Sequence, residues 1–233
     1  MKTIDITFDL ETCALCPTTA VMSMGAVAWQ RQATETPFLL IENKTKTVTF
    51  DPSYVFSAHV DLRGMFVDGF TFDQQTADWW AKRSDDAKRA VLATDCEDMP
   101  CAPIEKVVKD FFEWLLYVKM TTEADEVCLW SQGSDFDIAI LRNICSRYHI
   151  DLPVSYKNFR DHRTFYMEGA RIICAIAGVE FDADRAYSLV DEYDEKGAAH
   201  DPVYDCKRSI FSTWQMMKHM RCLRRPGDKP TKK

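Results

Sequence analysis

The chain has 233 residues, of which 46% are hydrophobic, enough to fold as one domain with a full core. Its 36 acidic and 29 basic residues give a net charge of −7, which argues against a protein that grips nucleic acid along its whole length. No apolar run approaches the roughly 18 residues of a membrane span, and the start is too acidic for a signal peptide. We therefore expect no membrane contact and a cytoplasmic location.

The nine cysteines are scattered along the chain and odd in number. This usage indicates free thiols in a reducing compartment and not a disulfide scaffold. Cys13 and Cys16 have the spacing of a zinc knuckle, but no similarly ordered second pair follows. We therefore expect small buried thiols near a strand end.

The first predicted element is a strand over residues 3–10, where apolar and polar residues alternate from Ile4 onward. Continuing the alternation puts Asp9 and Glu11 on one face, about 6 to 7 Å apart. Two such carboxylates repel each other unless a cation or solvent lies between them. The pattern is typical of a divalent-metal site, or alternatively of an edge strand with a solvated acidic face.

The middle of the chain is predicted to change from strands to helices. The expected elements are strands at 22–30 and within 36–50, an irregular stretch over 51–72, and helices at 74–83, 85–94 and 104–116. Trp79 and Trp80 are adjacent in the first of these helices, so their directions differ by about 100°. One ring can therefore be a stacking platform for a base, although two core tryptophans are an equally good interpretation.

The second half is predicted to alternate strands and helices. The expected elements are a strand at 127–131, a helix at 134–148, an extended piece at 158–161, and helices at 164–177 and 201–221. Ser134 suits an N-cap with Asp137 in the capping-box position. The functional alternative is that Asp137, following a strand, points across the sheet end towards Asp9 and Glu11.

The start of the last predicted helix contains a second group of candidate site residues. Asp201 suits the N-cap and Pro202 the first helical position, which leaves His200 just outside and Asp205 in the first turns. The positive end of the helix favours an ionised Asp205. A surface histidine beside a dipole-complementing aspartate is the alternative for this segment alone.

Taken in order, the segments Asp9-Leu10-Glu11-Thr12, Phe136-Asp137 and His200 to Asp205 resemble the DEDDh group of 3′→5′ exonucleases over about residues 3–217. Further segments resemble the phage T4-type exonuclease A branch and, more distantly, bacterial exoribonucleases that trim adenylate-rich ends. These segments are Asp78-Trp79-Trp80, Asp86 to Arg89, Arg160 to Thr164, and Ala199-His200-Asp201. The resemblance suggests a phage-encoded member, which would act in the host cytoplasm.

This resemblance implies an α/β, ribonuclease H-like fold with a mixed central sheet flanked by helices. It implies a 3′→5′ exonuclease that hydrolyses DNA, preferentially single-stranded, and releases nucleoside monophosphates. RNA is the alternative substrate because the site chemistry does not depend on the sugar. A non-catalytic subunit that binds nucleic acid or a polymerase is the other alternative, although all five expected side chains are present.

The implied cofactors are two divalent ions, Mg²⁺ or Mn²⁺. Asp9 would bridge both ions, Glu11 and Asp205 would hold the ion that activates water, and Asp137 would hold the ion beside the leaving oxygen. His200 would be the general base, a role that suits an imidazole near neutral pH. The expected substrate contacts are Thr12, Met22, Trp79, Trp80 and Phe136, with core packing as the alternative for the apolar ones.

We expect residues 1–222 to form a single exonuclease domain and residues 223–233 to form a basic, disordered tail. Residues 218–233 contain seven basic residues and only Asp228 as an acid. The acidic loop at 179–199 has no assigned structure. A homodimer is possible because some members of the group dimerise.

Overall fold

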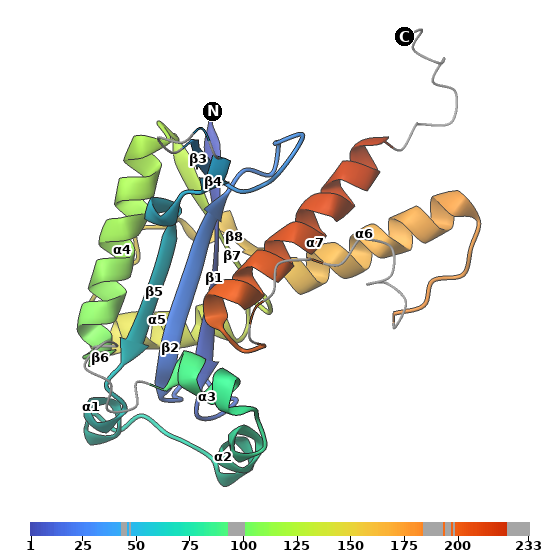
Figure 1. Cartoon of the computed structure of the whole chain (residues 1–233). Helices are drawn as coiled ribbons and strands as arrows, with labels where there is room; N and C mark the ends of the chain where they lie inside the picture. The colour runs from blue at the N-terminus through green and yellow to red at the C-terminus, as the bar shows by residue number, and fades with distance from the viewer. Residues whose placement is uncertain are drawn as a thin grey trace, which may run out of the picture.

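The computed structural model describes residues 1–42, 46, 48–92, 101–183, 193, 197 and 199–222. Its centre is a six-stranded mixed sheet in the order β6-β5-β2-β1-β7-β8 (Figure 1). The long strands are β1 (Thr3–Thr12) and β2 (Val21–Trp29). They are antiparallel, and Asp9 lies opposite Gly25.

The remaining strands extend the sheet on both sides. They are β5 (Val55–Val60), β6 (Cys101–Ala102), β7 (Glu126–Ser131) and β8 (Phe159–Asp161). Strand β7 is parallel to β1, so their carboxyl ends lie at the same edge. A separate two-stranded sheet contains β3 (Leu40–Glu42) and β4 (Val48–Phe50). The single turns η1 (Pro52–Tyr54) and η2 (Tyr156–Asn158) precede β5 and β8.

Helices cover both faces of the sheet (Figure 1). Helices α4 (Ile104–Thr121) and α5 (Asp137–Arg147) lie on one face, and α6 (His162–Ala177) and α7 (Pro202–Cys222) pack together on the other. The short helices α1 (Leu62–Val67), α2 (Gln74–Ala81) and α3 (Asp85–Val91) lie near the carboxyl end of β1. The architecture is the predicted helix-covered mixed sheet.

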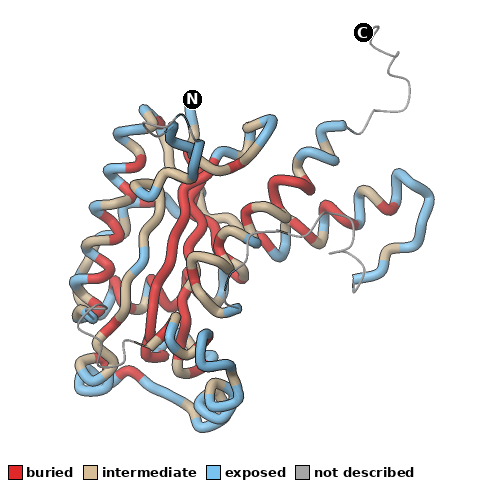
Figure 2. The backbone as a smooth tube through the Cα atoms, viewed as in Figure 1, coloured by how far each residue is buried: buried red, intermediate tan, exposed pale blue. Residues whose placement is uncertain are grey.

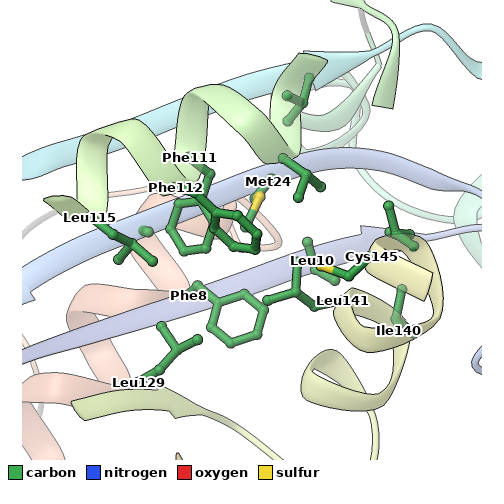
Figure 3. Packing of buried hydrophobic residues seen from close by; sticks show 14 of the residues in the cluster. Phe8, Leu10, Met24, Phe111, Phe112, Leu115, Leu129, Ile140, Leu141 and Cys145 are labelled. Carbon is green, nitrogen blue, oxygen red and sulfur yellow. The ribbon is translucent and has the colours of Figure 1, made fainter. Parts of the chain in front are cut away.

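The main core lies between the sheet and α4 and α5 (Figure 3). The apolar side chains that alternate along β1 point into it, and the ring of Phe8 lies 5.9 Å from that of Phe111. Every residue of β2 is buried, as the red strand in the middle of Figure 2 shows. Burial on both faces fixes the register of β1, because a one-residue slip would put its carboxylates into this core.

The other face of β1 is polar but buried. Asp5 accepts hydrogen bonds from Arg31 and from the indole of Trp130. Thr7 accepts a bond from the Trp29 indole and pairs with His162 Nε2 at 2.8 Å. The two polar side chains that precede Asp9 on this face are therefore satisfied by protein partners.

Several predicted elements are wrong in detail. The region 36–50 forms the small sheet, and the third long strand of the main sheet, β5, lies in the stretch expected to be irregular. The alternation of β5 is weak because most of its residues are only half-buried. Helix α1 was not expected at all.

One capping prediction is wrong. Helix α5 begins at Asp137, not at Ser134, and has no side-chain cap. The N–H of Ser134 instead donates to Asp161. Asp161 also caps α6, since it accepts a bond from the backbone N–H of Thr164. By contrast, Asp201 caps α7 as predicted, accepting bonds from Val203 and Tyr204.

The expected tail at 223–233 and most of the acidic loop at 179–199 lie outside the described residues. Within the described part, each cysteine is a free thiol. No helix there is both long and apolar enough to cross a membrane.

Candidate active site

The site is built at the carboxyl end of β1. Asp9 and Glu11 project from the face opposite the main core, in line with Asp5 and Thr7. Among the described residues, none donates a hydrogen bond to the side chain of Asp9 or Glu11. This differs from the full satisfaction of Asp5 and leaves both carboxylates free for another ligand.

Asp137 joins them from the first position of α5. It is 2% exposed, and its Oδ1 accepts a bond from the backbone N–H of Leu10, between the two β1 carboxylates. Because β7 and β1 are parallel, the residues that follow β7 reach the edge where β1 ends. Asp137 therefore lies beside the two β1 carboxylates, as a metal ligand would, and α5 has no side-chain cap.

Asp205 and His200 reach the site from the start of α7. One ligand atom from each of Glu11, His200 and Asp205 fits within 4.8 Å of the others. The backbone N–H of His200 donates to Asp205 Oδ2 at 3.1 Å, and His200 has a positive φ of 70°. The turn before the helix thus points the imidazole back at the carboxylates.

Gly25 makes this approach of α7 possible. A Cβ atom at this position would lie 2.6 Å from the backbone nitrogen of Val203, far inside contact distance. The helix start therefore packs directly on β2, beside Asp9 in the next strand. Gly25 was not predicted from the sequence to belong to the site, although a glycine inside a strand is a sign of close backbone approach.

Burial and mutual repulsion raise the pKa values of the carboxyl groups in the site. Burial, followed by the negative charge of Asp205, raises the pKa of Glu11 to about 8. Burial raises the pKa of Asp137 to about 7 against the opposing bond from Leu10. The pKa of Asp9 is raised well above its usual range by burial and then by Asp137. The cluster is thus electrostatically costly when nothing positive lies in it.

This donor set fits a divalent cation. Carboxylate oxygens are the ligands that Mg²⁺ and Mn²⁺ prefer, and the four carboxylates have few protein donors of their own. A cation between them would remove the repulsion that raises their pKa values. Asp9, Glu11, Asp137 and Asp205 are the residues that could hold such ions.

Two tryptophans enclose the histidine. The ring of His200 lies 4.8 Å from that of Trp79 and 5.6 Å from that of Trp80, edge to face with both. Trp80 donates its indole N–H to the Thr12 carbonyl at 3.1 Å, which ties α2 to the end of β1. Trp79 is 39% exposed and Trp80 is half-buried, so neither ring is a simple core residue.

A cavity, here called the front cavity, opens beside Glu11. Its lining includes Leu10, Glu11, Thr12, Leu15, Gln75, Thr76, Trp79, Trp80 and Phe136. Four of the five predicted substrate contacts therefore meet in one place. Met22 does not join them, because it lies in a neighbouring apolar cavity with Cys13 and Phe66, beyond Trp80.

A second, polar cavity, here called the rear cavity, opens beside Asp9. Its lining includes Asp9, Gln132, His162, Arg163, Tyr166, Asp205, Arg208, Ser209, Ser212 and Thr213. Of these residues, only Asp9 and Asp205 are predicted from the sequence to belong to the site. The segment Arg160 to Thr164 is one of those that resemble known exonucleases, but its residue spacing predicts no role for Arg163.

Comparisons with known proteins identify a family and a fold for this chain. The model of the family described as "3'-5' exoribonuclease Rv2179c-like domain" matches residues 5–210, which include all five site residues. The comparison with curated proteins found no match. None of these findings supports the closer likeness to phage exonuclease A.

Solved structures share the fold. The chain superposes on cell-death related nuclease 4 (CRN-4) with a TM-score of 0.56 and 13% identity, covering 93% of this chain and 64% of that one. It superposes on the nuclease domain of 3'hExo, a DEDDh family member bound to rAMP, with a TM-score of 0.51 and 14% identity, covering 96% of each chain. The fold is that of the DEDDh nucleases, and the chain belongs to the Rv2179c-like 3′-5′ exoribonuclease domain family.

Proposed function

We propose that this exonuclease removes nucleotides one at a time from the 3′ ends of single-stranded RNA and releases nucleoside 5′-monophosphates. The observation that carries the proposal is the meeting of Asp9, Glu11, Asp137, Asp205 and His200 at one sheet edge, beside an aromatic cavity. The family description favours RNA over the DNA expected from the sequence. DNA becomes the alternative that the experiment below must exclude.

In this proposal Asp9, Glu11, Asp137 and Asp205 hold two divalent ions, as the resemblance implies. When bound, such ions neutralise the phosphate, lower the pKa of the attacking water and stabilise the departing 3′ oxygen. The carboxylates must be ionised to bind them, so the protons held by Glu11 and Asp137 leave as the ions enter. All five side chains come from one chain, so the site needs no second copy.

His200 is the general base. Its imidazole lies beside Glu11 and Asp205 and is only partly buried, so it can accept the proton of an attacking water. Its backbone bond to Asp205 and its contacts with the two tryptophans hold the ring at the cluster. Orientation of this kind is a main contribution that a protein makes to such a reaction.

The front cavity receives the terminal nucleoside. Trp79, Trp80 and Phe136 offer aromatic surfaces on which any base can stack, with about 1 to 3 kcal/mol for each stacked base. Because the front cavity adjoins Glu11, a base bound in it lies next to the carboxylates, and the scissile phosphate then lies among them. A single strand suits this arrangement, because the terminal base must leave its stack to enter.

The test is degradation of RNA and DNA of the same sequence, each labelled at the 5′ end, in Mg²⁺ or Mn²⁺ and in EDTA. The proposal predicts RNA ladders that shorten from the 3′ end, metal dependence, and loss of activity in Asp205→Asn. The exposed surface change Glu168→Gln is the matched control and should behave as wild type.

Faster shortening of DNA would replace RNA with DNA as the substrate. No shortening of either polymer with metal present would contradict catalysis and favour the non-catalytic binding subunit.

A further inference from the structure

The two cavities beside the carboxylates differ in chemistry. The front cavity is lined mainly by apolar and aromatic side chains and adjoins Glu11, whereas the rear cavity is lined mainly by polar ones and adjoins Asp9. Asp9 and Glu11 are two residues apart on the same strand face, so the cavities meet at the cluster. If the terminal nucleoside occupies the front cavity, the rest of the RNA must leave the carboxylate cluster on another side.

Two arginines line the rear cavity. Arg163 lies at the start of α6 and Arg208 on α7, and each side chain is substantially exposed. Within the described part of the chain, no carboxylate lies within ion-pair distance of Arg163. Among the described residues, its guanidinium makes one hydrogen bond, from Nη2 to the carbonyl of Gln132 at 3.2 Å, so most of its five donors remain available. Its positive charge also acts on the carboxylates of Asp137 and Asp161.

The surrounding chain holds Arg163 in place. The loop after β7 turns at Gly133, which has a φ of 118°, a conformation that favours glycine. Gly133 is packed against Arg163, since a Cβ there would lie 3.6 Å from Nη1. This loop also presents the Gln132 carbonyl that receives the guanidinium. The arginine is therefore directed by the same segment that carries Asp137.

His162 and Thr213 form an uncharged, hydrogen-bonded part of the cavity lining, beside the carboxylates of Asp9 and Asp205. His162 is 2% exposed and bridges Thr7 Oγ1 on β1 and Thr213 Oγ1 on α7, at 2.8 and 2.7 Å. Burial lowers its pKa to about 3, so the imidazole is neutral at physiological pH. The positive charge of this cavity thus comes from Arg163 and Arg208.

We propose that the rear cavity is a subsite for the substrate phosphate one nucleotide upstream of the scissile bond, and that Arg163 is its main ligand. The cavity volume of about 220 Å³ equals that of several water molecules at about 30 Å³ each, enough for a phosphate group. A guanidinium group can bind two phosphate oxygens at once. The protein as a whole has a net charge of −7, so it offers the phosphate little other electrostatic attraction. Arg208 contributes less, because it is bonded to Asp205 at 3.2 Å.

The inference rests on the proposed function, and a pair of dinucleotides separates the two. A ribodinucleotide with a 5′-hydroxyl has only the scissile phosphate, whereas its 5′-phosphorylated form adds one phosphate at the proposed position. Wild type should cleave the phosphorylated form with a kcat/KM about tenfold higher, chiefly through KM, as expected for a charged hydrogen bond. Arg163→Gln should remove this advantage.

Arg171→Gln, a change further along the same helix, is the control and should keep the full advantage. Calorimetric binding of both dinucleotides to Glu11→Gln, with and without Arg163→Gln, gives the same comparison without turnover. Equal values for the two dinucleotides in wild type would overturn the inference and leave the exonuclease intact. Cleavage of longer RNA but of neither dinucleotide would also overturn it, whereas no cleavage of any RNA would overturn the proposed function.

Discussion

The ionised side chain of Glu11 should lower the free energy of unfolding of the metal-free protein. A bound metal ion should restore this stability. Its pKa of about 8 lies far above the usual 4.5, so the folded protein holds the Glu11 proton much more tightly than the unfolded chain does. The stabilising effect of this protonation is present below about pH 4.5 and is lost as the pH rises to about 8. Glu11→Gln cannot ionise and should escape this loss.

The size of the effect follows from the two pKa values. Each pKa unit corresponds to about 1.36 kcal/mol, so at pH 8 the ionisation of Glu11 costs the folded state at most about 4 kcal/mol. At pH 4.5 the cost is below about 1 kcal/mol. Glu11→Gln should therefore raise the free energy of unfolding by up to this amount at pH 8 and hardly change it at pH 4.5.

The assay is urea unfolding of both proteins in EDTA at the two pH values, repeated at pH 8 with Mg²⁺. Added Mg²⁺ should stabilise wild type more than the variant, because the variant has lost a ligand. Glu168→Gln, whose side chain is 65% exposed, should stay within about 0.5 kcal/mol of wild type. A Glu11→Gln protein less stable than wild type in EDTA at pH 8 would refute the reasoning.

Three further predictions follow from the same geometry. Gly25→Ala should shift the start of α7, cost about 1 to 3 kcal/mol by overpacking, and lower kcat by about 100-fold; unchanged kinetics would contradict the packing argument. The Mg²⁺ affinity measured by calorimetry should rise about a hundredfold between about pH 6.5 and 8.5, most steeply at the acidic end, because Glu11 and Asp137 must both lose protons; a flat profile would oppose this. Trp79→Ala should lower kcat/KM by about tenfold or more in steady-state assays, since Trp79 lines the front cavity and contacts His200; an unchanged kcat/KM would exclude both roles.

The site was more predictable from the sequence than the fold details. The strict alternation of β1 places Asp9 and Glu11 on one face, and the N-cap and proline at 201–202 define where α7 begins. Both signals are local and need no knowledge of the rest of the chain. The ordered motifs then connect these segments with Asp137.

The features that the sequence did not reveal depend on contacts between distant segments. Strand β5 is half-buried and, on the side away from β2, pairs only with the two-residue strand β6, so its alternation is blurred. Asp161 caps α6 and also accepts a bond from the N–H of Ser134 in the loop before α5, a long-range contact that no local spacing predicts. The rear cavity needs α6, α7 and the β7–α5 loop together, and no spacing in one segment predicts that meeting.

The most direct test of the central claim is the identity of the products of RNA cleavage in water enriched with ¹⁸O. Attack of water on the phosphorus, with departure of the 3′ oxygen, predicts nucleoside 5′-monophosphates that carry one ¹⁸O and shortened strands that end in a 3′-hydroxyl. Mass spectrometry of a Mg²⁺-dependent reaction, with Asp205→Asn as the inactive control, reads out both products. Strands that end in a 3′-phosphate or a 2′,3′-cyclic phosphate, or cleavage that persists in EDTA, would contradict the account.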